Sequence, residues 1–138
     1  GCSEEPEVTP AEYSRLLTGE TSKTWRYQSF EFIFDEEDIN PVNLTPPCLF
    51  SGSLVFSRQG RVLEINDDCS PLDRNENIGT FWAVNNANAT LTIGGLEPYT
   101  IKQLTANTLV FGFKTPVTFN SINTQTGFAQ FTFKVQAQ

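Results

Sequence analysis

The sequence predicts an all-β protein: an eight-stranded antiparallel up-and-down β-barrel with one short N-terminal helix. Three observations favour this fold. Apolar residues alternate with polar ones along most of the chain, short turns rich in Asn and Gly separate these stretches, and 12 Phe residues supply bulk for an interior. Closing eight strands removes exposed sheet edges and gives every apolar face one common interior. A β-sandwich uses the same alternation and is the alternative.

A short helix is expected before the first strand. Thr9 can serve as its N-cap, Pro10 suits the first helical position, and Glu12 can reach back to complete a capping box. Gly19 is placed to end the helix, since glycine readily adopts the left-handed conformation found there. One short amphipathic helix results, with an apolar face that needs cover.

The first long strand, residues 24–34, changes face part-way along. Trp25 and Tyr27 fall on one face, whereas the Phe residues from Phe30 onward fall on the other. An extra residue in a strand restores such a pattern to a single face, so a β-bulge is predicted near residues 28–29.

Seven further strands follow, each marked by an apolar residue at every second position. Turns are expected at residues 58–60, 85–88, 94–95 and 106–107, where Gly and Asn cluster. The apolar positions that mark the strands are Leu54 and Phe56, Leu63 and Ile65, Trp82 and Val84, Leu91 and Ile93, Tyr99 and Ile101, Leu109 to Phe113, and Ala129 to Val135.

Three cysteines divide unevenly along the chain. Cys48 and Cys69 flank a strongly strand-like stretch, and in an oxidising compartment we expect them to pair. The bond would close a loop of about 22 residues and stabilise the fold by roughly 3 kcal/mol. Cys2 is then left over and needs its own explanation.

Charge and composition argue against several functions. The net charge of −7 disfavours nucleic acid and anionic bilayers as partners. The absence of His removes the commonest general base and zinc ligand, so we expect no enzyme and no cofactor. The acidic run at residues 35–38 lacks the alternating ligands and central Gly of an EF-hand, so no metal site is expected there.

Several of the predicted strands resemble a known family. Trp25 opens the first long strand after a short helix, and the chain later reads GTFW at 79–82, LTI at 91–93, YTIKQL at 99–104 and TLVF at 108–111. This succession resembles the lipocalin-like lipoproteins of Bacteroidetes over residues 20–136. The resemblance implies a small secreted β-barrel of the cell envelope.

The start of the chain resembles the mature start of a bacterial lipoprotein. Such proteins are cut before a cysteine that receives acyl chains, and Cys2 is followed by Ser3, Glu4 and Glu5. We therefore expect Cys2 to be a lipid anchor to the outer membrane, on its surface or periplasmic side. Residues 1–8 are interpreted as a flexible tether, and residues 9–138 as the barrel domain.

Two hypotheses for function follow. In the first, the barrel binds a small apolar or amphipathic ligand through inward aromatic side chains. In the second, the interior is solid and a non-catalytic interaction module binds a protein or glycan through loops or outer faces. A monomer is expected in either case. The candidate ligand-binding residues are Trp25, Trp82, Tyr99, Phe111, Phe113 and Phe131.

Overall fold

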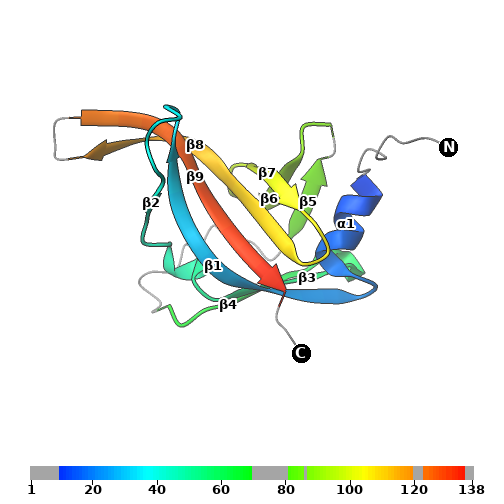
Figure 1. The fold of residues 1–138 in the computed structure, drawn as a ribbon. Coiled ribbons are helices and arrows are strands. Elements are labelled where there is room, and N and C mark those ends of the chain that lie inside the picture. The colour runs from blue at the N-terminus through cyan, green and yellow to red at the C-terminus, as the bar shows by residue number, and fades with distance from the viewer. Residues whose placement is uncertain (1–9, 70–80, 86, 120–122, 136–138) are drawn as a thin grey trace.

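A computed structural model describes residues 10–69, 81–85, 87–119 and 123–135 (Figure 1). It contains one α-helix, α1 (Pro10–Thr18), and two short 3-10 helices, η1 (Cys48–Phe50) and η2 (Gln59–Arg61). The strands are β1 (Ser22–Phe34), β2 (Val42–Asn43), β3 (Ser53–Ser57), β4 (Leu63–Asn66), β5 (Trp82–Asn85), β6 (Thr90–Ile93), β7 (Tyr99–Leu104), β8 (Thr108–Phe119) and β9 (Asn123–Val135).

The strands form an antiparallel barrel that is nearly closed. Their order is β4-β3-β1-β9-β8-β7-β6-β5: β3 pairs with β4, the strands from β5 to β9 pair consecutively, and β1 lies between β3 and β9. The circle is loosest between β4 and β5, which are linked by the single bridge Val62↔Phe81. The two-residue β2 adds a short pairing to β1, with Val42 opposite Phe32. The predicted up-and-down barrel is therefore confirmed.

The N-terminal helix ends where the sequence predicts. Gly19 adopts a left-handed φ of 62° and its N–H donates to the Arg15 carbonyl (2.7 Å), which closes the last turn. Leu17 on the helix is fully buried, so α1 covers one end of the barrel with its apolar face. The predicted N-cap, Thr9, lies outside the described residues.

The predicted bulge in β1 is also present. The register against β9 shifts between Tyr27 and Ser29, which adds one residue to β1. As a result Trp25 and Phe30 both contribute to the same core despite their odd and even numbers. The turns at 58–60 and 94–95 are confirmed as well, with Gly60 at φ 65° and Gly94 at φ 56°.

The last two strands are longer than the sequence predicts. The apolar alternation marks only Leu109 to Phe113 and Ala129 to Val135, whereas β8 and β9 pair all the way to Phe119↔Asn123. Half of the added residues, at 114–119 and 123–128, are Thr, Gln or Asn, so the apolar alternation is weaker there. The Thr118 and Thr124 hydroxyls lie 2.9 Å apart across this extension.

One hydrophobic core fills the barrel. It is built by α1, η1 and every barrel strand, so both ends of the interior contribute to it as well as the walls. Its members are Leu17, Trp25, Phe30, Phe50, Leu54, Phe56, Leu63, Trp82, Leu91, Ile93, Ile101, Leu109, Phe111, Ala129, Phe131 and Phe133.

Candidate binding site at the barrel mouth

Four of the six candidate ligand-binding residues lie buried in the hydrophobic core. Trp25, Phe111 and Phe131 have no exposed surface, and Trp82 is 3% exposed. A void beside these side chains that could admit even one water molecule would leave part of their surface accessible. The side chains that were candidates to line a cavity therefore fill it.

The two tryptophans also satisfy their polar atoms within the fold. The Trp25 indole N–H donates to the Leu17 carbonyl of α1 (2.9 Å), and that of Trp82 donates to the Ser57 carbonyl at the end of β3 (3.0 Å). A buried indole normally finds such a partner. Each tryptophan thus ties a strand to its surroundings and has no donor left for a ligand.

A phenylalanine from outside the strands plugs one end of the barrel. Phe50, in the short helix η1, is 4% exposed. Its ring centroid lies 5.2 Å from that of Phe131, 6.0 Å from Tyr99 and 6.4 Å from Phe111. These are ordinary aromatic contacts. The end of the barrel that η1 occupies is called the mouth below.

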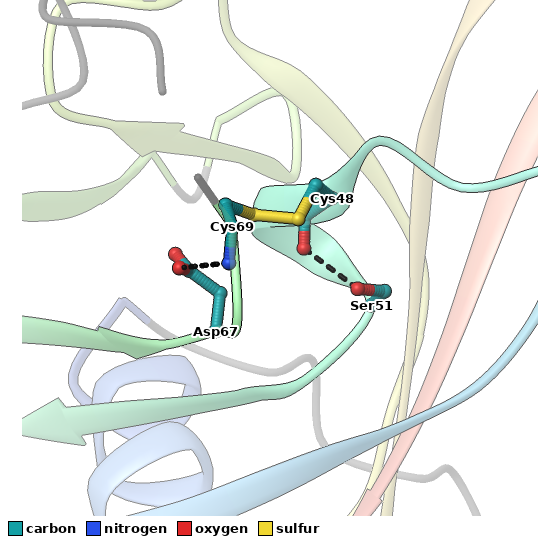
Figure 2. The surroundings of a disulfide bond; sticks show 4 residues. All are labelled: Cys48, Ser51, Asp67 and Cys69. Carbon is teal, nitrogen blue, oxygen red and sulfur yellow. Dashed lines mark hydrogen bonds between the residues drawn. A yellow bond between two sulfur atoms is a disulfide. The ribbon is translucent and has the colours of Figure 1, made fainter. Parts of the chain in front are cut away.

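A disulfide fixes this plug in place, as Figure 2 shows. Cys48 of η1 bonds to Cys69, which follows β4, so the predicted pairing is confirmed. The Ser51 hydroxyl donates to the Cys48 carbonyl (2.7 Å), and the Cys69 N–H donates to an Asp67 carboxylate oxygen (3.0 Å). The disulfide fits an oxidising compartment outside the cytoplasm.

The opposite end is closed by α1. The Lys23 ammonium donates to the Leu16 carbonyl of the helix (2.9 Å) and to the Ala106 carbonyl in the β7–β8 turn (2.8 Å). It also lies 5.1 Å from the Trp25 ring centroid. Partial burial of this ammonium lowers the pKa of Lys23. These contacts hold the helix over the barrel end.

The remaining two candidate residues meet in a surface groove at the mouth. Tyr99 begins β7, Phe113 lies beside it on β8, and their ring centroids are 5.9 Å apart. Leu96, Glu97, Pro98 and Lys114 complete a mostly apolar groove of about 430 Å³, which is within the range of ligand sites.

Tyr99 connects this groove to the plug. Its ring contacts Phe113 on the groove side and Phe50 on the core side. Burial raises the pKa of the Tyr99 phenol, because an apolar setting disfavours the phenolate. Phe113 itself is 38% exposed, an unusual fraction for a large aromatic residue beside a core.

Sequence reasoning missed the rest of the site. Leu96 and Pro98 lie in the β6–β7 turn and Phe50 lies in the short helix η1, and none of these positions belongs to an alternating stretch. A signal was present for the turn, since Gly94 and Pro98 bracket a short segment that contains an apolar residue.

Comparisons with known protein families, with curated proteins and with solved structures found no match for this chain. Within the described residues, no three His, Cys, Asp or Glu side chains are grouped as a metal site would require. A helix long and apolar enough to cross a membrane is likewise not found among them. Cys2 and the predicted tether lie outside the described part of the chain.

Proposed function

We propose that this protein is a non-catalytic module of the bacterial cell envelope that binds a protein partner through the mouth groove. The observation that carries the proposal is the filled interior: Trp25, Phe111 and Phe131 have no exposed surface, so a ligand has no space inside. Of the two hypotheses from sequence, a solid interaction module fits this better than a carrier.

The groove favours a protein partner over a glycan. Its lining is mostly apolar, and Glu97 and Lys114 are the charged residues in it. A sugar needs many hydrogen-bonding groups, whereas an apolar side chain of a protein needs only apolar surface. Tyr99 and Phe113 offer two rigid aromatic faces for such a side chain.

The lipid anchor belongs to the same proposal. Acylation of Cys2 would hold the barrel at the outer membrane, and residues 3–8 would let its mouth reach a partner. Replacing Cys2 by Ser should move the protein from the membrane fraction to the soluble fraction and remove the acyl mass. A variant that stays in the membrane fraction would contradict the anchor.

The binding function is tested with a phage library of random linear peptides and with a glycan array. We expect the wild-type protein to select related peptides and Phe113→Ser to lose them. Phe81→Ser is the matched control, because Phe81 is 64% exposed and lies at the β4–β5 junction, outside the residues that line the groove.

Two results would overturn the proposal. Glycan binding that depends on Phe113, without peptide selection, would make the partner a sugar. Tight binding of the apolar dye N-phenyl-1-naphthylamine, unaffected by Phe113→Ser, would instead place a ligand in the interior and restore the carrier hypothesis.

A further inference from the structure

The β8–β9 hairpin extends beyond the rest of the barrel. β7 pairs with β8 only as far as Thr100↔Gly112, and β1 pairs with β9 only as far as Phe34↔Gly127. Figure 1 shows the hairpin projecting at the end of the molecule opposite α1. Among the described strands, β8 past Gly112 therefore has a neighbour on one side only.

The direction of the main-chain groups on β8 follows from two hydrogen bonds on β9. The Val135 N–H donates to the Asn107 carbonyl, toward β8, and the Thr126 carbonyl accepts from Asp35, toward β1 (both 3.1 Å). Along a strand, the main-chain N–H and C=O groups of successive residues point to alternate sides. Two residues opposite each other in an antiparallel ladder either both point these groups at each other or both point them away. Pro116 lies opposite Thr126, so its main-chain groups face away from β9.

The same alternation places Lys114 and Thr118 at this open edge with Pro116. All three residues are exposed. Among the described residues, the one hydrogen bond found at these main-chain groups runs from the Thr115 hydroxyl to the Pro116 carbonyl (3.2 Å). The edge from Lys114 to Thr118 is about 16 Å long at the usual rise per residue.

The open edge begins at the mouth groove. Continuing the β7–β8 register would place Pro98 opposite Lys114, but proline has no N–H to donate, so the ladder stops there. Pro98 and Lys114 both line the groove. Apolar surface and unpaired main-chain groups therefore lie next to each other.

We propose that the partner is an extended peptide segment that adds as a strand to the open edge of β8, from Lys114 to Thr118. One apolar side chain of that segment occupies the groove beside Tyr99 and Phe113. This inference rests on the proposed function and gives it a recognition mode, in which main-chain bonds supply affinity and a side-chain pocket supplies specificity.

Pro116 favours a foreign peptide over a second copy of this chain. Two copies pairing antiparallel about Pro116 would lose both central hydrogen bonds, because neither proline has a donor. A foreign strand loses only one. No charged residue occurs from Thr115 to Gly127, so Lys114 is the one charged residue of the edge, and a neutral or acidic strand meets no like charge there.

The test uses a peptide selected by the phage library, synthesised with a single N-methyl group at successive positions. We expect methylation at alternate positions to weaken binding about tenfold or more, and methylation between them to have little effect, because only every second N–H of an added strand faces β8.

Variants of the protein test the same main-chain hydrogen bonds at β8 instead of at the peptide. Thr118→Pro removes an edge donor without touching the ladder to β9, and should weaken binding about fivefold; Pro116→Thr adds a donor and should strengthen it by a similar factor. Thr118→Val keeps the N–H and is the matched control, with affinity unchanged. Thermal unfolding of each variant shows whether it folds.

The outcomes separate the two proposals. If no selected peptide depends on Phe113, the proposed function fails. If peptides depend on Phe113 but N-methylation shows no alternation and Pro116→Thr gains no affinity, strand addition is wrong and the groove alone binds. Sedimentation that shows wild-type dimers broken by Thr118→Pro would overturn the choice of occupant, because a second copy would then fill the edge.

Discussion

Replacing Phe50 by Ala should hollow the mouth of the barrel. The ring is 4% exposed and contacts the rings of Tyr99, Phe111 and Phe131, so its removal leaves an apolar cavity among them. Cys48, two residues earlier, is tied to Cys69, which keeps η1 from following the lost ring inward. The cavity should therefore persist.

The cost can be worked out from this geometry. Phe-to-Ala changes in cores cost about 3–5 kcal/mol, and a site that cannot collapse keeps the cavity part of that cost, so we expect about 4 kcal/mol, the middle of the range. Unfolding entropy of about 2.1 cal/mol/K per residue over 138 residues converts this into a fall in Tm of about 14 °C.

Thermal and urea unfolding of wild type and Phe50→Ala measure the loss. Phe81→Ala is the control, since an exposed side chain should change stability by less than about 0.5 kcal/mol. Benzene should raise the Tm of Phe50→Ala alone, because it fits the space of the missing ring. An unchanged Tm for Phe50→Ala, or an equal benzene effect on wild type, would refute the argument that the interior is filled.

Three further predictions concern the disulfide, one glycine and one tyrosine. Reducing the Cys48–Cys69 bond should lower the free energy of unfolding by about 3 kcal/mol, and coincident urea midpoints with and without reductant would contradict this. Gly127→Ala should cost about 1–3 kcal/mol, because a Cβ there would meet the main-chain carbonyl oxygen of Ile33 and the Phe32 ring; an unaltered midpoint would show that both the strand and the ring can shift. Burial raises the pKa of Tyr99, so the stability it contributes is fully present below pH 10.0 and lost as pH rises through the folded pKa. Phenolate absorbance of wild type minus Tyr99→Phe should therefore titrate above pH 10.0, and a midpoint at or below it would contradict the burial.

The sequence was most informative about the strands and the bulge, where the side-chain pattern follows directly from the backbone conformation. The alternation around Trp82, Leu91 and Ile93 identifies strands because each strand has one solvent-facing side and one buried side. The change of face between Tyr27 and Phe30 predicted a bulge, because only an extra residue lets the apolar side chains before and after it point into the same barrel interior. The extension of β8 and β9 escaped prediction, since most of its described residues are exposed or only half-buried and impose little apolar period.

The binding site was less predictable than the fold. An aromatic residue at an inward position serves equally to fill a barrel or to line a cavity, and alternation cannot tell these apart. The decisive contribution comes from Phe50, which enters the barrel from a loop whose placement depends on tertiary contacts and a disulfide. Tyr99 and Phe113 lie at the groove because β7 begins directly after Pro98, which has no N–H to extend the ladder toward β8.

Pairing of β1 with β9 has a consequence for how the protein is made. The two strands meet in register from Trp25↔Val135 to Phe34↔Gly127, about a hundred residues apart along the chain. Contacts of such separation form late and slow folding. The barrel cannot close until its final strand, β9, has left the ribosome or the export channel. Until then β1 and β8 both lack β9, the strand that lies between them in the closed barrel. A chaperone that shields these strands during export would therefore act before closure, and truncation within β9 should trap the chain in the unclosed state.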